Sequence, residues 1–533
     1  MENQILCGVI VVREYRWVKT VGSGMLLALL MALAGCSGGA GPSPSPPSPS
    51  PSPRPLATAT VAPPTATATP ARTPEGTGTP AVSAAPVDVI IVGAGLSGLT
   101  TAYELKKAGI SYKVLEATPR VGGRARTGSY PDQHQAEVGL AEFWTGNPAI
   151  DVCKELGIEL ELVEPGLSSF VIDGKLYPFT TYNSNQEFIK ASLGKDYPEY
   201  QAWDAEMEKL VHEVESGKIS PDMMKLKEIS FAKWLETQKI SPLAREMVRA
   251  VLEPEIGVAI ERIGALDGIA EWHLFAGKGA TPQHCVGGNE KLPLALAKAV
   301  GEDNVSLNTQ VTNVIDGPDG VEVRAVDTTN FDNKTFKAKY VVLTVPLYRL
   351  FEIQFVPRLD KKIYEAIHTQ GWGAYFTAHV VLDKAAEKFW SVDGTSVLPI
   401  LSGGPLGCIY PGHAGGREGT VMLNCLVTGA EAEAYNSRER SLDDVQAAME
   451  GEMERMWPGS KARVKQWTFY RYHPRAIASW PVGRSRFDDL SENLRKPHGR
   501  LYFGGDFTES SHSDGAMKSA LRMASQLKTT LGK

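Results

Sequence analysis

The chain has 533 residues, 43% of them hydrophobic and 22% charged, which is long enough for about two domains with sizeable cores. Its formal net charge is −6, a balance that argues against the basic surface needed to bind nucleic acid. The six cysteines have neither Cys-x-x-Cys nor zinc-like spacing, so we expect no metal site, and whether Cys153, Cys285, Cys408 and Cys425 pair stays open.

Residues 1–36 have the pattern of an export signal. Basic residues between positions 13 and 19 precede an apolar run at residues 25–33, which is shorter than the ~20 residues of a membrane-spanning helix. The Leu-Ala-Gly-Cys that follows resembles a bacterial lipobox, in which Cys36 would be acylated and become the mature N-terminus. We therefore expect an exported, extracytoplasmic protein held at the cell membrane by a lipid; an uncleaved anchor is the alternative.

Residues 37–86 are rich in proline, with fourteen prolines among Ser, Thr, Ala and Gly. Such a segment cannot bury a core, so we expect a disordered, semi-extended linker. At ~3.1 Å per residue it would hold the remaining chain up to ~150 Å from a membrane.

A dinucleotide-binding pattern opens the folded part of the chain. An apolar, β-branched run at residues 89–92 ends in G-x-G-x-x-G, and a helical pattern follows at residues 100–108. The first glycine allows a tight turn, the second lets the backbone approach a pyrophosphate, and the third lets the helix pack closely. The helix N-terminus then presents free N–H groups to the phosphates. The residues predicted to bind the cofactor here are Gly93, Gly95, Leu96, Ser97 and Gly98.

The next strand and turn extend this pattern. A predicted strand at residues 112–115 ends at Glu116, 23 residues after Gly93, where a carboxylate can accept hydrogen bonds from ribose hydroxyls. Glycines in the following turn would let the chain pass close to the cofactor, and its arginines could neutralise pyrophosphate charge. These residues are Arg120, Gly122, Gly123 and Arg124. The run from 117 to 127 resembles the second half of the FAD motif of the flavin-containing amine oxidases, which include monoamine oxidase, polyamine oxidase and L-amino-acid oxidase.

In that family the segment matching residues 137–144 runs beside the flavin ring, so the resemblance places Glu142 and Trp144 near the substrate. L-amino-acid oxidases generally carry an arginine near this point that clamps the substrate carboxylate. An acid would repel a carboxylate and attract an ammonium group, which favours a cationic amine; a surface or helix-capping glutamate is the alternative. Residues 165–275, rich in charge and helical pattern, occupy the family's usual place for a substrate-domain insertion.

A second block with family resemblance begins at residues 286–293, a glycine turn that leads into a predicted helix at 294–300. A predicted strand at residues 305–311 follows, and a hairpin turn at 316–320 joins it to the next strand. In the family, the backbone at the position of Val311 meets the adenine.

The third block lies at the C-terminus, where a strand enters a glycine turn and a helix begins near Asp514. In the family, an acid at the position of Asp506 helps to hold the flavin phosphate and ribityl chain. The helix N-terminus faces the pyrimidine edge of the flavin, where its positive dipole end would stabilise the charge of reduced flavin. The residues assigned to the cofactor here are Gly505, Asp506, Gly515, Ala516 and Met517.

The order of the three blocks predicts an α/β protein: a Rossmann-like FAD-binding domain with an inserted α+β substrate-binding domain. The expected division of the chain is residues 1–36 as signal peptide, 37–86 as linker, 87–164, 281–350 and 471–533 as the FAD-binding domain, and 165–280 and 351–470 as the substrate domain.

The resemblance also implies a reaction. A C–H bond next to an amine nitrogen gives hydride to flavin N5, oxygen or another acceptor reoxidises the flavin, oxygen yielding hydrogen peroxide, and the imine hydrolyses. The chain departs from the family at several positions. Thr377 stands where a lysine commonly holds a water at N5, and Ala476 or Ile477 where an aromatic wall stands in monoamine oxidase. Trp480 and His512 are candidate substitutes for the walls, with simple packing as the alternative.

The cysteine that binds flavin covalently in monoamine oxidase is also missing, so the resemblance implies noncovalent FAD. Two other functions stay open. One is a C–C desaturase or protoporphyrinogen-oxidase-like enzyme, which shares the FAD blocks and acts on apolar substrates. The other is a non-catalytic FAD-binding protein, which the missing lysine and aromatic walls would permit.

Overall fold

The computed structural model describes residues 85–162, 169–172, 175–178, 185–276, 281–402, 404–412 and 416–533. All of them fall in one compact unit. The predicted signal peptide, with Cys36, and nearly all of the linker lie outside the described residues. Within the described part of the chain, no helix is long and apolar enough to cross a membrane.

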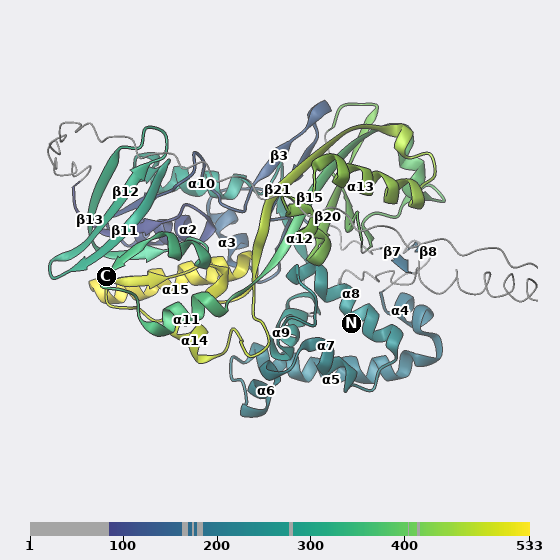
Figure 1. Cartoon of the computed structure of the whole chain (residues 1–533), viewed down its shortest axis with the longest axis horizontal. Helices are drawn as coiled ribbons and strands as arrows, with labels where there is room; N and C mark the ends of the chain where they lie inside the picture. The colour runs from purple at the N-terminus through teal and green to yellow at the C-terminus, as the bar shows by residue number, and fades with distance from the viewer. Residues whose placement is uncertain are drawn as a thin grey trace, which may run out of the picture. The chain divides into compact units, whose positions relative to one another are not determined.

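The first sheet has eight strands in the order β10-β2-β1-β13-β12-β11-β14, with β22 paired to β13. Its strands β11, β12 and β13 are labelled in Figure 1. The strands β10, β2, β1, β13 and β22 pair with one another in parallel, whereas β13, β12 and β11 form an antiparallel meander. Their bounds are β1 Val87–Val92, β2 Tyr112–Leu115, β10 Val305–Ser306, β11 Thr309–Gly317, β12 Gly320–Asp327, β13 Asn333–Leu343, β14 Gln354–Val356 and β22 Leu501–Phe503.

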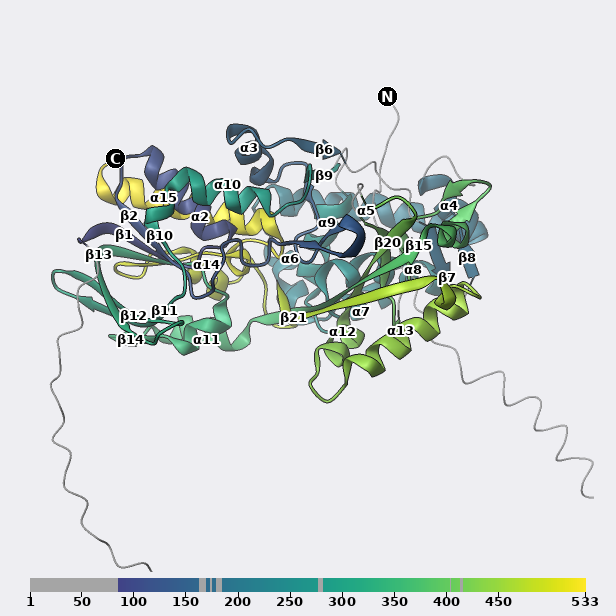
Figure 2. The same cartoon turned by 90° about the horizontal axis from the view of Figure 1, so that it is seen from above.

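Both faces of this sheet are covered. Successive side chains of a strand point to opposite sides, so a single strand can contribute to an apolar cluster on each face. Val89 and Ile91 of β1 belong to one apolar cluster, and Ile90 and Val92 belong to another. Three helices cover the first face, and two cover the second (Figure 2). They are α2 Leu96–Lys107, α10 Lys291–Val300 and α15 Ser513–Leu531, and then α11 Lys361–Thr369 and α14 Asp489–Arg495. The predicted α/β fold with a Rossmann-like sheet is confirmed.

A second sheet has seven strands in the order β21-β15-β20-β19-β18-β7-β8. Their bounds are β7 Ser169–Ile172, β8 Lys175–Tyr177, β15 Gly371–Asp383, β18 Ile400–Leu401, β19 Cys408–Pro411, β20 Thr420–Thr428 and β21 Val464–Ser479. Helices α12 (Gly429–Asn436) and α13 (Leu442–Met456) pack against this sheet.

Six further helices gather around an apolar cluster that we name the helical core, which draws nearly all its members from residues 188–272 (Figure 1). The helices are α4 Asn185–Leu193, α5 Tyr197–Glu215, α6 Pro221–Lys225, α7 Phe231–Glu236, α8 Pro242–Ile256 and α9 Ala265–Ala276. The remaining helix is α3 Pro148–Glu155. A small sheet contains β5 Phe143–Trp144, β6 Leu160–Leu162 and β9 Pro282–Cys285. Two strand pairs are also present: β3 Thr127–Ser129 with β4 Gln135–Glu137, and β16 Ser391–Val392 with β17 Thr395–Ser396.

The prediction of one strand at residues 305–311 is wrong. The chain forms β10, which pairs with β2, and then β11, which pairs with β12. Between them Asn308 has a φ of 52°, a conformation that asparagine tolerates better than most residues. This turn lets Asn308 N donate to the Thr118 carbonyl and Thr309 N to the Glu116 carbonyl, which brings the second sequence block beside the first.

Candidate active site

The first glycine turn has the geometry that its sequence predicts. Gly93 has a φ of 107°, and a Cβ on Gly98 would lie 2.0 Å from the Gly93 carbonyl oxygen, so both positions require glycine. A Cβ on Gly95 would meet no protein atom within 4 Å. No described side chain caps α2 at Gly95, so the first N–H groups of the helix stay available to an anion.

Glu116 holds this turn in place. One carboxylate oxygen accepts from Ala94 N at 2.8 Å, and the other accepts from the backbone and hydroxyl of Thr118 at 3.0 and 2.8 Å. Each carboxylate oxygen has more than one lone pair, so these bonds leave acceptor capacity for a ribose hydroxyl. Val311, 5% exposed, lies on β11 two residues beyond Thr309, whose N–H bonds the Glu116 carbonyl.

The second glycine turn packs against the first. Gly122 N donates to the Ala94 carbonyl at 2.8 Å, and a Cβ on Gly123 would lie 3.5 Å from the Gly95 Cα. Arg120 donates to the carbonyls of Val121 and Gly123 at 3.0 and 2.5 Å. Its guanidinium therefore braces its own turn.

Arg124 joins the first block to the third. Its guanidinium makes a bidentate pair with Asp506 at 2.7 and 2.8 Å and donates to the Ala476 carbonyl at 2.6 Å. Asp506 also accepts from Ala478 N at 3.3 Å and follows Gly505, whose φ is 144°. The Arg124 side chain stays 39% exposed although that of Asp506 is 3% exposed, so the pair leaves part of the guanidinium open to a ligand.

The helices α2 and α15 lie side by side although they come from opposite ends of the described chain (Figure 2). Ser97 Oγ and Ser519 Oγ are 2.9 Å apart, and Thr100 Oγ1 donates to Met517 Sδ at 3.3 Å. The first turn of α15 contains Gly515, where a Cβ would lie 2.1 Å from the Ser510 carbonyl oxygen. Leu96, Ala516 and Met517 are 8%, 9% and 0% exposed.

These features fit an extended dinucleotide such as FAD. The adjacent helices α2 and α15 each have an N-terminus without a described side-chain cap, and the fixed N–H groups of such an end favour phosphate or another anion. The open space beside Gly95 would let a ligand lie directly against the backbone of the turn. Glu116 and Arg124 then supply an acceptor and a cation within the same group of turns.

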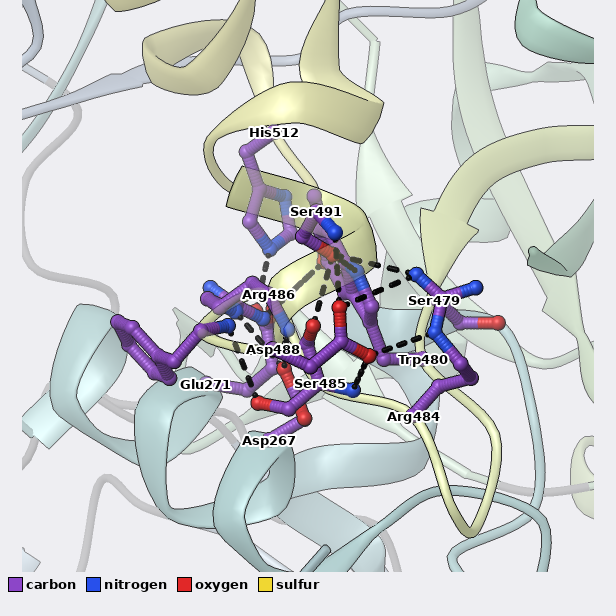
Figure 3. Close-up of polar contacts among 12 residues, drawn as sticks. Asp267, Glu271, Ser479, Trp480, Arg484, Ser485, Arg486, Asp488, Ser491 and His512 are labelled. Atoms are coloured by element: carbon purple, nitrogen blue, oxygen red, sulfur yellow. Dashed lines mark hydrogen bonds and ion pairs between the residues drawn. The ribbon is translucent and has the colours of Figure 1, made fainter. Parts of the chain in front are cut away.

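A buried ionic group lies at the start of α15 (Figure 3). His512 Nε2 is 2.9 Å from Glu271 Oε2, and Ser511 Oγ donates to Glu271 Oε1 at 2.6 Å. Arg486 donates to Asp267 at 3.0 Å and also contacts Glu271. Burial alone would lower the pKa of His512, but the Glu271 carboxylate outweighs it and raises that pKa, which favours the imidazolium form.

The Trp480 side chain packs against this ionic group. It is 1% exposed, its Nε1 donates to Ser491 Oγ at 3.1 Å, and the Arg486 guanidinium lies 4.6 Å from its ring centroid. The ring therefore has no open face for a substrate, and the alternative of simple packing describes it. His512, in contrast, keeps 25% of its side chain exposed.

Two carboxyl groups lie near His512. Burial raises the pKa of Glu142 to about 7 and that of Glu255 to about 8, and the His512 charge opposes the rise in both. The Glu142 charge adds to the rise at Glu255, so the two groups are near enough to interact, and both residues remain partly accessible. Trp144 hydrogen-bonds Glu142. Near neutral pH, this site holds carboxyls that a bound cation would drive toward the ionised form.

Sequence reasoning missed Glu255 and Glu271. Glu255 is the second-last residue of α8 and shows no sequence signal that distinguishes it from the other acids of that helix. Glu271 did carry a signal, because it and Asp267 stand four residues apart on the mostly apolar helix α9. Acids at that spacing share one helix face and require buried partners there.

Thr377 lies on β15, is 8% exposed and donates to the Val138 carbonyl at 3.3 Å. Its neighbour across the sheet is Tyr470, whose hydroxyl accepts from Arg126 at 2.9 Å. Ala476 and Ile477 are each 6% exposed. Among the residues that the structure describes, no group of His, Cys, Asp and Glu is arranged to hold a metal ion.

Over residues 96–528 the chain matches the family described as flavin containing amine oxidoreductase. It is 25% identical over 472 residues to a probable flavin-containing monoamine oxidase A of Dictyostelium discoideum, a match that covers 83% of this chain and 98% of that protein. It is also 25% identical over 466 residues to an L-amino-acid oxidase of Sistrurus catenatus edwardsii, with 82% and 86% covered.

Two solved structures have similar folds. Wild-type putrescine oxidase bound to putrescine has a TM-score of 0.68 at 24% identity, over 84% of this chain and 99% of that one. Cyclohexylamine oxidase from Brevibacterium oxydans has a TM-score of 0.68 at 19% identity, over 84% and 100%. At these identities the likeness establishes the fold and leaves the substrate open.

Proposed function

The chain belongs to the flavin containing amine oxidoreductase family and is an FAD-dependent oxidoreductase; from this premise we propose that it oxidises the carbon–nitrogen bond of a small cationic amine. The observation that carries the proposal is the pair of interacting carboxyls, Glu142 and Glu255, near His512. A substrate carboxylate would disfavour the ionised forms of these acids, whereas an ammonium group would stabilise them. This arrangement favours an amine over an amino acid.

The residues that would hold FAD come from all three sequence blocks. The N-termini of α2 and α15 suit the phosphates and the flavin edge, and Glu116 suits the adenosine ribose. Arg124 and Asp506 form one bidentate unit between these blocks. When bound, FAD supplies a hydride acceptor that amino-acid side chains lack. The chain itself has to orient the amine, exclude water and keep its nitrogen unprotonated.

We infer that His512 and the two carboxyls keep the nitrogen of the bound amine unprotonated. An imidazolium disfavours a second positive charge beside it, so we infer that it promotes loss of the proton from a bound ammonium group. A carboxyl with a pKa near 7 can accept that proton at neutral pH. We assign this task to Glu142 and propose Trp144 as its orienting neighbour.

We further propose that FAD is held noncovalently and that oxygen reoxidises it slowly. The first proposal rests on the absence of the family's flavin-linking cysteine from residues 467–483, and the second rests on threonine at position 377. Acid precipitation of the protein should release free flavin to the supernatant. Flavin that stays with the precipitate would contradict the noncovalent assignment.

Export and lipid attachment at Cys36 are also proposals, supported by the sequence pattern of residues 1–36. Cell fractionation of the full chain tests them. We expect the protein in the membrane fraction and Cys36→Ser in the soluble fraction or retained as an unprocessed precursor. Equal fractionation of both proteins, with both processed to the same length, would exclude the anchor.

The main test is anaerobic titration of the purified protein with a panel of amines, polyamines and amino acids, following flavin absorbance. We expect bleaching by cationic amines and little by amino acids, and Glu142→Gln should weaken the amine response. Bleaching by amino acids alone would refute the substrate class. Turnover only of apolar substrates with dye acceptors would indicate a desaturase-like enzyme, and a flavin that no substrate bleaches would indicate a non-catalytic protein.

A further inference from the structure

Two thiols from distant parts of the chain meet in the interior. Cys153 on α3 and Cys285 at the end of β9 are both 0% exposed, and their Sγ atoms lie 3.9 Å apart although the residues are 132 positions apart in sequence. Both belong to the apolar cluster that covers one face of the first sheet.

The position of this pair in the fold is specific. Between the two cysteines the chain leaves the first-sheet cluster, forms α4 to α9 around the helical core, and returns at β9. Cys153 and Cys285 therefore stand where the helical segment departs and where it comes back. A bond between them would close that segment at its base.

The backbone on both sides is fixed by hydrogen bonds. The Cys153 carbonyl accepts from Ile158 N at 2.8 Å, and Cys285 N donates to Asn289 Oδ1 at 2.9 Å. β9 is further paired with β5 and β6. A disulfide requires a sulfur separation of ~2.05 Å, so the sulfurs have to approach by roughly 1.9 Å from the 3.9 Å that separates them here.

We propose that Cys153 and Cys285 form a disulfide when the chain folds in an oxidising compartment. The oxidant is a small or protein disulfide. One protein thiolate attacks it and releases one thiol; the second protein thiolate then attacks the resulting mixed disulfide and releases the other thiol. The protein loses two protons and two electrons, and the external disulfide is reduced to two thiols.

Burial determines when this exchange takes place. The hydrogen bond to Cys285 and burial together raise the pKa of the Cys153 thiol, so the folded protein presents little thiolate to an oxidant. The bond therefore forms before the cluster closes. Once closed, the same burial shields it from reductants.

The chain also contains a matched control pair. Cys408 and Cys425 are 1% and 2% exposed and lie on the paired strands β19 and β20. Cys408 pairs with Leu426 and Ile409 pairs with Cys425, which places the two sulfurs on opposite faces, one in the helical core and one in the cluster beneath the second sheet. These equally buried thiols should stay reduced under the same conditions.

The test is to express residues 37–533, without the predicted export signal, in a reducing cytoplasm and in a cytoplasm that lacks thiol reductases. Each product is denatured with an alkylating agent, digested and mapped by mass spectrometry, which assigns the four remaining cysteines one by one. We expect a Cys153–Cys285 peptide from the oxidising host, and alkylated Cys408 and Cys425 from both. Four alkylated thiols from both hosts, or linkage of either proposed cysteine to another partner, would overturn the proposal.

A second measurement does not depend on folding of a variant. Native oxidised protein should resist dithiothreitol and lose the bond only after denaturation. Its melting temperature, with FAD saturating, should exceed that of the reduced protein, because a crosslink over a long loop restricts the unfolded chain. Cys153→Ser and Cys285→Ser should each melt at the same temperature from both hosts, whereas Cys408→Ser should keep the difference. A bond that dithiothreitol reduces rapidly in the native protein would contradict the burial argument.

Discussion

Alanine substitutions at Gly95 and Gly98 separate two reasons for glycine in the first turn. A Cβ on Gly98 would lie 2.0 Å from the Gly93 carbonyl oxygen and 2.8 Å from Thr344 Oγ1, so Gly98→Ala has to push α2 away from the turn. A Cβ on Gly95 would meet nothing within 4 Å, and its φ of −78° suits alanine. Gly95→Ala therefore adds a methyl group only to the space that we assign to the cofactor pyrophosphate.

Gly98→Ala should change mainly the free energy of folding, and Gly95→Ala mainly the Kd for FAD. Ordinary contact begins at 3.4 Å, so the methyl group at Gly98 overlaps the carbonyl oxygen by about 1.4 Å, and overpacking typically costs about 1–3 kcal/mol of folding free energy. At Gly95, alanine in place of glycine at a helix N-cap costs less than about 1 kcal/mol. If the methyl group keeps the pyrophosphate from the helix, the loss falls on binding instead. We expect the Kd for FAD to rise at least about tenfold, or ~1.4 kcal/mol.

Two measurements on each apoprotein distinguish these effects. Circular dichroism gives the melting temperature without cofactor, and quenching of flavin fluorescence gives the Kd for FAD. Gly98→Ala should lower the melting temperature, whereas Gly95→Ala should lower it less and lose affinity. Gly451 is exposed in α13, and a methyl group there would meet no atom within 4 Å, so its alanine variant is a control that should leave the Kd for FAD unchanged and raise the melting temperature slightly, because alanine is the better helix former. Wild-type affinity in Gly95→Ala, or melting as early as in Gly98→Ala, would refute the assignment.

Four other substitutions test the site. Glu116→Ala should weaken FAD retention on gel filtration, because the carboxylate that holds the first turn and faces the ribose is lost. In the wild type, the KM for a cationic amine should fall as pH rises through about 7, since Glu142 is neutral below its pKa and charged above it. Glu142→Gln should remove this step, leave the dependence that comes from Glu255, and raise KM above pH 7 by about tenfold. Glu271→Gln should lower the pKa of His512 in a histidine NMR titration, because the carboxylate that raises it is gone. Thr377→Lys should speed flavin reoxidation in stopped-flow measurements, and unchanged kinetics would mean that this position does not face the flavin.

The parts of the fold that sequence predicts well depend on local signals. The strand predicted at residues 112–115 has the bounds of β2, and the helix predicted near Asp514 begins at Ser513. The turn from Gly93 to Gly98 is predictable because the atoms that require glycine there, such as the Gly93 carbonyl oxygen, belong to the same short segment. In each case, the residues that decide the structure lie within a few positions of one another.

Prediction from sequence fails where contacts with a distant part of the chain determine the local structure. The apolar alternation of residues 305–311 is compatible with one strand, yet Asn308 turns because β10 pairs with β2 while β11 pairs with β12. Trp480 has the chemistry of a substrate wall, and only its contacts with Arg486 and Ser491 reveal that it is enclosed. Propensity and spacing carry no information about which edge or side chain will be the neighbour.

The buried acids of α9 show how far sequence can lead toward the site. Asp267 and Glu271 stand on one face of an apolar helix, and an unpaired charge there would cost several kcal/mol, so the sequence itself requires a cation opposite them. It does not identify that cation, because Arg486 lies 215 residues beyond Glu271 and resembles any other arginine of the chain. Once the two segments are brought together, Glu271 has an oxygen left for His512. The charge state of the imidazole at the start of α15 is therefore set by a pairing that exists only in the folded chain.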